Sequence, residues 1–324
     1  MTERNILVTG ASTPLGERLI ETLLADSRIG HVIAVSDKGR PLTIPDSDRL
    51  TSFELKLRKQ RGLHDLLFGP ARNRRIDVLI HTSLISNANW EGAAVHAHNV
   101  DVLRAILDFA ERHPTISKLI VRSSAGVYQV QRDLPALIGE DHPLNMNSGA
   151  PQWVRDRVEA DVTACTRMGL SSLEIVVLRM AEILGPGCGS QVFDYLQSPV
   201  CLRPIGYDPM LNFLTIRDAV SAITLAVHGV SQGVFNIPGA DTLPLSATIS
   251  RWGRLGIPLP EGAIGSLYKL RRRLRGGEFR YGMNRRRFHY SGILDGKRAA
   301  ETLSYIPSHP VEWPVQHVTS DDNG

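Results

Sequence analysis

Cysteine is scarce in this chain, which has only Cys165, Cys188 and Cys201 among its 324 residues. None of them belongs to a C-x-x-C pair, so neither a disulfide framework nor a zinc or dithiol redox site is indicated. Long apolar runs are also missing, because no stretch approaches the roughly 18–20 residues that span a bilayer. The sequence runs directly into a strand-like stretch at 6–8, without the regions of a signal peptide. We therefore expect reduced thiols and a cytoplasmic protein.

The composition is that of a globular protein. Hydrophobic residues make up 42% of the chain and charged residues 22%, and neither a low-complexity tract nor a repeat is evident, so disordered and fibrous classes are excluded. The length permits one large α/β domain or two modest ones.

Short apolar strands alternate with helical stretches in the first half of the chain. The strand-like stretches are 6–9, 31–35, 76–82, 118–121 and 173–179, and the helical ones are 15–25, 60–68, 93–113 and 152–168. Residues 76–82 form a nearly continuous apolar run, which is typical of a strand buried on both faces. Strands that alternate with helices predict a parallel sheet with right-handed crossovers. The sequence therefore predicts an α/β fold with a doubly wound parallel sheet of the Rossmann type.

A glycine-containing turn, VTGASTPLG at 8–16, follows the first strand and opens a helix. Gly10 permits a tight turn, Gly16 permits close helix packing, and the helix N-terminus offers free N–H groups to a pyrophosphate. The predicted contact residues are Gly10, Ser12, Thr13, Pro14, Leu15 and Gly16. Thr13 replaces the middle glycine of the usual pattern, and it either pushes a cofactor outward or donates to phosphate. The alternative is a strand–helix turn that binds nothing.

An acid follows the second strand at the position that usually contacts the adenosine ribose. Asp37 falls 21 residues after Gly16, close to the interval of such motifs. An acid disfavours a 2′-phosphate, so NAD is the preferred cofactor, although Lys38 and Arg40 could accommodate NADP. The alternative is that Asp37 is a solvated loop residue.

These residues resemble the extended short-chain dehydrogenase/reductase family, the NAD-dependent epimerase/dehydratases typified by UDP-glucose 4-epimerase. The resemblance covers residues 5–314, and its further motifs are DVLIHTS at 77–83, Asn99, SSAGVY at 123–128, LRMAEILGPG at 178–187 and FLTIRD at 213–218. It implies that the cofactor lies near Thr82, Ser83, Asn99 and Ser123. It also implies that Ser124 is the catalytic serine.

The sequence departs from this family at the proton-transfer pair Y-x-x-x-K. Trp153 occupies the tyrosine position and Arg157 the lysine position, and Asp161 follows as the family's acid. An indole N–H donates a hydrogen bond but does not titrate near neutral pH, and an arginine does not shuttle protons. Arg157 could still hold the ribose hydroxyls of a cofactor. A misaligned motif is disfavoured, because residues 129–194 hold no tyrosine and residues 119–194 no lysine.

Two explanations of this departure remain open. Another group could act as the acid, and the candidates are Tyr128, His81, Glu140, Asp141 and Glu182. Alternatively, the protein binds a dinucleotide without turnover, as a sensor or scaffold. We expect an atypical NAD(P)-binding, epimerase/dehydratase-like protein for a nucleotide-sugar-like small molecule, with the non-catalytic protein as the alternative. No metal site is indicated, and a homodimer is implied by the resemblance only.

The domain organisation follows from the same motifs. Residues 1–180 are expected to form the dinucleotide-binding Rossmann domain, and part of 205–240 is expected to return to it. Residues 181–324 are then the smaller C-terminal substrate lobe.

One segment of that lobe carries the excess positive charge. Residues 269–287 hold nine Lys or Arg against one acid, Glu278, so the remainder of a chain of net charge +4 is slightly acidic. The segment either contacts an anionic partner, such as a lipid surface or a pyrophosphate, or forms a solvated basic face. Gly276 and Gly277 interrupt a continuous amphipathic helix, which weakens the membrane interpretation. No nucleic-acid-binding module is recognisable, so no nucleic-acid partner is expected.

Overall fold

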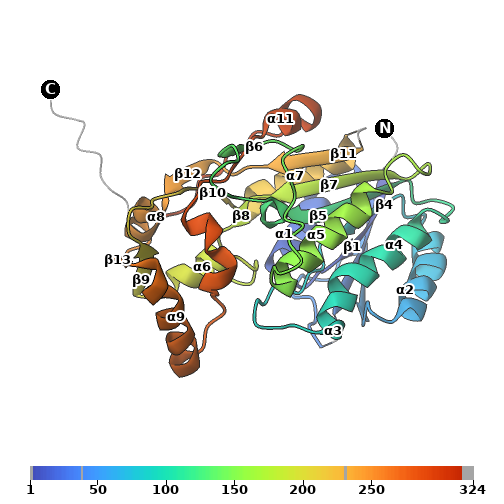
Figure 1. Cartoon of the computed structure of the whole chain (residues 1–324). Coiled ribbons are helices and arrows are strands. Elements are labelled where there is room, and N and C mark those ends of the chain that lie inside the picture. The colour runs from blue at the N-terminus through green and yellow to red at the C-terminus, as the bar shows by residue number, and fades with distance from the viewer. Residues whose placement is uncertain (1–2, 38, 230–231, 316–324) are drawn as a thin grey trace.

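A computed structural model describes residues 3–37, 39–229 and 232–315, and its main feature is a seven-stranded sheet (Figure 1). The strand order is β11-β7-β5-β4-β1-β2-β3, and every neighbouring pair is parallel. The strands are β1 (Arg4–Thr9), β2 (Ile29–Asp37), β3 (Leu50–Leu55), β4 (Val78–His81), β5 (Lys118–Ser124), β7 (Glu174–Met180) and β11 (Gly233–Ile237). This is the predicted doubly wound Rossmann-type sheet, to which β3 adds a strand that the weak pattern of the sequence did not reveal.

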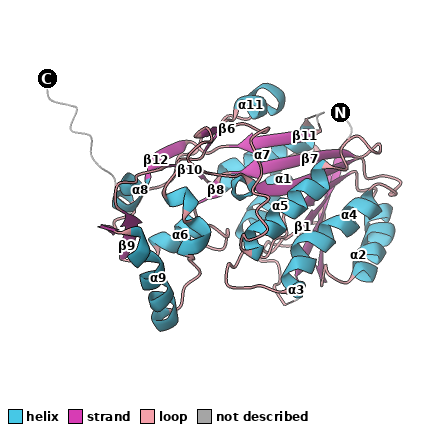
Figure 2. Cartoon of the chain, viewed as in Figure 1, coloured by secondary structure: helices cyan, strands magenta, loops and turns pink. Residues whose placement is uncertain are grey.

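Helices cover both faces of this sheet (Figure 2). They are α1 (Pro14–Ala25) and α7 (Ile216–His228), which pack together on one face, and α2 (Gln60–Leu66), α3 (Ala93–His96), α4 (Val102–Ala110) and α5 (Gln152–Cys165). In β1, Ile6 and Val8 belong to the hydrophobic cluster that includes α1 and α7, whereas Leu7 belongs to the cluster that includes α2 and α4. Successive strand residues point to opposite faces, so both faces need apolar side chains.

A second group of elements has its own aromatic core and lies beside the carboxyl ends of β4, β5 and β7 (Figure 1). Its strands are β6 (Leu137–Ile138), β8 (Glu182–Ile183), β9 (Val200–Pro204), β10 (Met210–Leu214), β12 (Asp241–Pro244), β13 (Leu255–Leu259) and β14 (Ile293–Leu294). Its helices are α6 (Gln191–Leu196), α8 (Leu245–Arg251), α9 (Glu261–Arg275) and α10 (Tyr281–Asn284). The last helix, α11 (Lys297–Leu303), packs instead against β11 and α7 of the seven-stranded sheet. The division into lobes at residue 180 stays a prediction.

Two compositional features of the sequence have structural counterparts. All three cysteines are free. Over the residues that the structure describes, no helix combines the length and the apolar character needed to cross a membrane.

Candidate functional site

Two positions in the turn after β1, Gly10 and Gly16, accommodate only glycine. Gly10 has φ +75°, and a β-carbon there would lie 2.8 Å from the backbone nitrogen of Ser83 and from Oγ1 of Thr82. A β-carbon at position 16 would lie 2.1 Å from the carbonyl oxygen of Gly10. The close approach of β1, α1 and the loop after β4 therefore depends on both glycines.

The hydroxyl of Thr13 is used inside the turn. It donates to the carbonyl oxygen of Gly10 at 2.8 Å and accepts from the amide of Gly16 at 3.1 Å, which caps α1. Within the described residues, the amides of Ser12 and Leu15 donate no hydrogen bond. Two free N–H groups at the start of a helix suit an anion.

Asp37 lies at the same edge of the sheet as the glycine turn. It ends β2, the neighbour of β1, where Thr9 is paired with Val35. Its carboxylate forms no hydrogen bond within the described part of the chain, so it is available to a ligand. Lys38, the other predicted contact here, lies outside the described residues.

The side chains expected beside a cofactor after β4 are tied to the protein itself. Thr82 Oγ1 donates to the carbonyl oxygen of Thr9 at 2.7 Å, and Ser83 Oγ lies 2.9 Å from His98 Nε2. Asn99 Oδ1 accepts from the amide of Ile85 at 2.9 Å. These bonds fix the loop after β4 over the sheet edge.

The two serines at the end of β5 have different surroundings. Ser123 Oγ donates to Asp161 Oδ2 at 2.5 Å, and the same buried carboxylate accepts two bonds from Arg179, at 2.6 and 3.0 Å. Ser124 Oγ accepts from the amide of Gly126 at 3.1 Å. Both serines line the small cavity described below, but only Ser123 is tied to a buried ionic network.

Trp153 and Arg157 stack on each other on α5. The guanidinium carbon of Arg157 lies 3.3 Å from the centroid of the indole, and Nη1 donates to the carbonyl oxygen of Trp153 at 2.9 Å. Trp153 Nε1 donates to the carbonyl oxygen of Ser86 at 3.0 Å. Arg157 is only 6% exposed, and no carboxylate lies within ion-pair distance of it in the described chain. Burial and, to a smaller extent, repulsion from Arg122 together lower the pKa of Arg157 to about 9.

The loop at 185–190 closes the space beside this pair. A β-carbon at Gly189 would lie 2.2 Å from Cβ of Ser86, and one at Gly187 would lie 3.1 Å from Cγ of Pro14. Arg122 Nη2 donates to the carbonyl oxygen of Cys188 at 3.0 Å. The remaining cavity has a volume of about 30 Å³ and is lined by Arg122, Ser123, Ser124, Trp153, Arg157 and Met180, among others. A volume of this size is enough for about two water molecules but is too small for an aromatic ring.

Two of the candidate replacement acids are locked into the interior. The hydroxyl of Tyr128 donates to Asn236 Oδ1 at 2.6 Å and accepts from Arg179 at 3.0 Å, and burial raises its pKa to about 12. Burial lowers the pKa of His81 to about 3, and its Nδ1 lies 2.8 Å from Thr9 Oγ1. Both groups are therefore neutral near pH 7, and neither lines the cavity.

The three carboxylates proposed as acids are also placed by the structure. Glu140 accepts from the amide of Asn236 at 2.8 Å, and Asp141 is exposed. Glu182 lines the cavity, but it pairs with Arg287 at 2.9 Å, and that arginine holds the pKa of the carboxyl below its ordinary value against the effect of burial. Glu182 is thus an ionised partner of an arginine rather than a proton donor.

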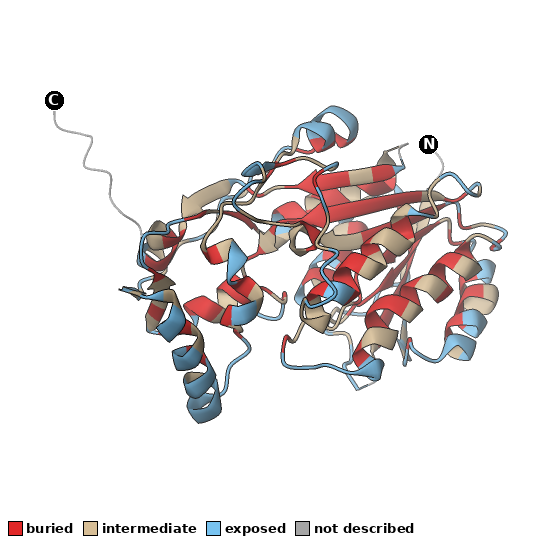
Figure 3. Ribbon diagram, viewed as in Figure 1, coloured by how far each residue is buried: buried red, intermediate tan, exposed pale blue. Residues whose placement is uncertain are grey.

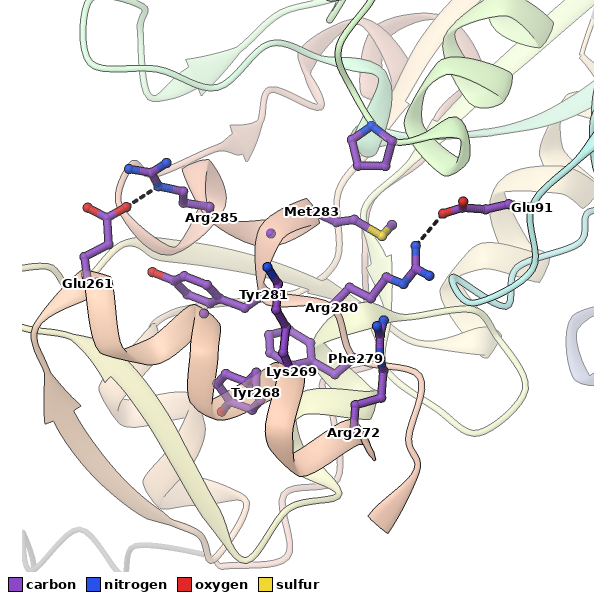
Figure 4. Close-up of a pocket in the computed structure, with 14 residues that line it drawn as sticks. Glu91, Glu261, Tyr268, Lys269, Arg272, Phe279, Arg280, Tyr281, Met283 and Arg285 are labelled. Carbon is purple, nitrogen blue, oxygen red and sulfur yellow. Dashed lines mark hydrogen bonds and ion pairs between the residues drawn. The ribbon is translucent and has the colours of Figure 1, made fainter. Parts of the chain in front are cut away.

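A larger cavity of about 680 Å³ lies between the second lobe and the loops that carry Glu91 and Pro151 (Figure 4). Tyr268, Phe279 and Tyr281 are among the aromatic and apolar side chains that line it. Its size and apolar lining are typical of small-molecule sites.

The charges of this cavity are unevenly paired. Arg280 forms an ion pair with Glu91 at 2.5 Å, and Arg285 pairs with Glu261 (Figure 4). Lys269 and Arg272 have no carboxylate partner within the described residues. The rim is therefore positive and suits an anionic ligand.

A parallel sheet with a glycine turn after its first strand, and a second lobe at the carboxyl ends of its strands, defines an α/β protein of the Rossmann type. The chain belongs to the NAD dependent epimerase/dehydratase family, whose model matches residues 6–237. This confirms the resemblance drawn from the motifs.

Known proteins similar to this chain include both uncharacterised sequences and solved enzymes. An uncharacterised protein of Mycobacterium tuberculosis is 27% identical over 310 residues, which cover 93% of this chain and 80% of that protein. The dTDP-glucose 4,6-dehydratase of Bacillus anthracis, solved with NAD, has a TM-score of 0.70 and 16% identity, and the match covers 94% of this chain and 92% of that one. The UDP-glucose 4-epimerase of Thermotoga maritima, solved with UDP-glucose, has a TM-score of 0.68 and 16% identity, with 94% and 93% covered. At such identities the solved structures establish the fold.

Sequence reasoning missed two contributors to the site. Arg122 precedes Ser123 directly, and a cation at the end of a buried strand was the signal that could have revealed it. The closure by residues 185–190 had no local signal, because it depends on contacts with Pro14 and Ser86.

Proposed function

We propose that this protein binds NAD through its ADP-ribose portion and does not perform the Tyr–Lys proton transfer of its family. The observation that carries the proposal is the stack of Trp153 on Arg157 beside a cavity of only about 30 Å³. NAD complexes of similar folds, such as the Bacillus anthracis dehydratase, support the choice of cofactor. The role is then sensing or assembly in the cytoplasm rather than epimerisation.

The adenosine half of a dinucleotide fits the described residues. The free amides of Ser12 and Leu15 would hold the pyrophosphate, and Gly10 lets the backbone approach it. The Asp37 carboxylate would accept the ribose hydroxyls and would repel a 2′-phosphate, which favours NAD over NADP.

The nicotinamide half does not fit. In a dehydrogenase the nicotinamide ring supplies a hydride acceptor, but the space beside Ser124 is filled by the side chains of Trp153, Arg157 and Arg122. Trp153 has no titrating group, and Arg157 remains protonated near neutral pH. We therefore derive no redox step at this site.

A second ligand is favoured by the cavity of about 680 Å³ between the lobes. Its aromatic lining offers stacking to a ring, and the unpaired Lys269 and Arg272 offer positive charge to phosphate. A nucleotide-sugar-like small molecule combines both features, and UDP-glucose is bound by the similar Thermotoga maritima epimerase.

Calorimetric titration of the full chain with NAD, ADP-ribose, NADP and nicotinamide mononucleotide tests the proposal. We expect ADP-ribose to bind within about three-fold of NAD, because a closed nicotinamide site adds no affinity. NADP should bind at least about ten-fold more weakly, an effect of roughly 1.4 kcal/mol, and the mononucleotide should not bind. Absence of binding by NAD and ADP-ribose, or turnover of UDP-glucose or dTDP-glucose with NAD, would overturn the proposal.

The cavity between the lobes is tested separately with UDP-glucose. We expect binding to weaken in Lys269→Gln with Arg272→Gln and to be unchanged in Arg132→Gln with Arg217→Gln, which removes the same charge from exposed positions elsewhere. Equal affinity in both double variants would exclude this cavity as the site.

A further inference from the structure

Helix α9 is attached to the protein along one narrow face. Only Ile264 and Tyr268 are buried among its residues. The hydroxyl of Tyr268 accepts from the amide of Leu202 at 3.0 Å, and Arg271 Nη1 donates to the carbonyl oxygen of Val200 at 2.8 Å, so α9 is held against β9. Its final turns extend away from the lobe and are exposed (Figures 1 and 3).

The exposed surface of α9 carries an apolar stripe. Ala263, Leu267, Leu270 and Leu274 are spaced by four, three and four residues, which places them within a sector of roughly 60° on a helix of 3.6 residues per turn. The three leucines are 41%, 53% and 74% exposed, and exposure increases toward the end of the helix. A contiguous row of exposed leucines usually marks a binding surface.

Positive charge borders this apolar stripe. Five of the fifteen residues of α9 are Lys or Arg, and its single acid, Glu261, is paired with Arg285. Arg273 and Arg275 are exposed and have no carboxylate partner in the described chain. They stand next to Leu274, at the end of the helix that extends farthest from the lobe.

The helix is not interrupted where this surface lies. Gly276, with φ +71°, ends α9 after Arg275, and the chain then returns to the lobe, where Phe279 is buried. The glycine pair therefore follows the amphipathic helix instead of dividing it, which corrects the objection raised from the sequence.

We propose that the apolar stripe of α9 docks the protein onto an anionic phospholipid bilayer, with the helix in the plane of the interface. The leucines would enter the boundary between headgroups and acyl chains, and Arg273 and Arg275 would contact lipid phosphates. Charge complementarity selects this partner. A second copy of α9 would bring like charges together, and a nucleic acid would leave the leucines in water. The proposal does not depend on dinucleotide binding.

Co-sedimentation of the full chain with vesicles tests this surface. The vesicles contain phosphatidylcholine alone, or phosphatidylcholine with a third of phosphatidylglycerol. We expect binding to the anionic vesicles only, and a decrease in binding when salt is raised. The variant Leu267→Ser, Leu270→Ser, Leu274→Ser should lose at least about ten-fold in partitioning. The variant Arg273→Gln, Arg275→Gln should lose about five-fold or more, with each arginine contributing.

Control variants replace exposed leucines or arginines that lie outside α9. Leu137→Ser with Leu170→Ser changes two exposed leucines, and Arg132→Gln with Arg217→Gln changes two exposed arginines. Both should bind like the parent protein, and all variants should keep its circular dichroism and its affinity for ADP-ribose. The proposal is wrong if the parent does not bind anionic vesicles, or if the leucine variant binds as well as the parent. It is equally wrong if the leucines hold a dimer in sedimentation equilibrium and vesicles are not bound.

Discussion

The guanidinium of Arg157 lies flat against the indole of Trp153, with 3.3 Å between its central carbon and the ring centroid. A buried cation normally requires a carboxylate, but here an aromatic face and one carbonyl oxygen are its nearest partners. The motif resemblance predicts that these two positions correspond to the proton-transfer pair of the family, and the stack fills them with groups that do not exchange protons near neutral pH.

Restoring the family pair alone should not restore catalysis. In the double variant Trp153→Tyr with Arg157→Lys, Arg122 and the loop at 185–190 still restrict the space beside Ser124. We expect no formation of NADH and no epimerised or dehydrated sugar when the variant is incubated with NAD and UDP-glucose or dTDP-glucose. Product detection by absorbance at 340 nm and by NMR checks this. Any turnover above that of the parent would show that the site is otherwise intact.

The glycine turn should be sensitive to a single methyl group. In Gly16→Ala the new β-carbon would lie 2.1 Å from the carbonyl oxygen of Gly10, so β1 and α1 must separate. We expect a loss of about 1–3 kcal/mol in the free energy of unfolding, as for other overpacked sites, and loss of ADP-ribose binding. Urea denaturation and calorimetry measure the two effects.

Gly62→Ala is the matched control for this substitution. Gly62 lies in α2, and a β-carbon there would be 3.9 Å from its nearest neighbour, Leu55. Alanine favours a helix over glycine by about 0.5–1 kcal/mol, so this variant should be as stable as the parent or more so and should bind ADP-ribose normally. Equal behaviour of the two variants would contradict the role of close packing at Gly16.

The sequence predicted more of the fold than of the site, because the sequence patterns that indicate the fold involve residues close together in the chain. Apolar runs such as 76–82 and the glycine turn at 8–16 require only neighbouring residues and the geometry of a parallel sheet. The small cavity beside Trp153 depends on Arg122 reaching Cys188, 66 residues later, and no periodicity of the sequence encodes that contact. The exposed apolar stripe of α9 was not predicted for a different reason. The sequence showed that the segment is basic, but it did not show that the helix begins at Glu261 and ends before Gly276.

The ionic network beneath the site should contribute strongly to stability. Asp161 accepts two bonds from Arg179 and one from Ser123, and both ionic side chains are buried. Asp161→Asn leaves the guanidinium without its counter-charge, so we expect a loss of about 3–5 kcal/mol in the free energy of unfolding. Urea denaturation of the variant measures it.

An exposed pair provides the comparison for this network. Asp101 pairs with Arg104 at 2.9 Å, and both side chains are nearly half exposed, so Asp101→Asn should cost less than about 1 kcal/mol. If Asp161→Asn lowered the free energy of unfolding no more than Asp101→Asn does, the buried network would not contribute to stability as proposed.

A carboxyl group in the second lobe should make stability depend on pH. Burial, together with the negative charges of Glu278 and Glu182, raises the pKa of Asp194 from its ordinary 3.8 to about 7. Between these two values the folded protein binds more protons than the unfolded chain, so the free energy of unfolding must fall as pH rises from about 4 to about 7. The destabilisation that results from ionising the buried Asp194 is absent below about pH 4 and complete above about pH 7.

Asp194→Asn should therefore stabilise the protein at pH 8 and have little effect at pH 4.5. A shift of this size corresponds to about 4 kcal/mol, but the side chain is partly exposed and screened by solvent, so we expect about 1–2 kcal/mol at pH 8. Urea denaturation at the two pH values measures the difference, and the exposed Asp133→Asn controls for the loss of one negative charge. A stabilisation by Asp194→Asn that is equal at both pH values would mean that the effect comes from packing or helix propensity, because only removal of a group that titrates between them can make it pH-dependent.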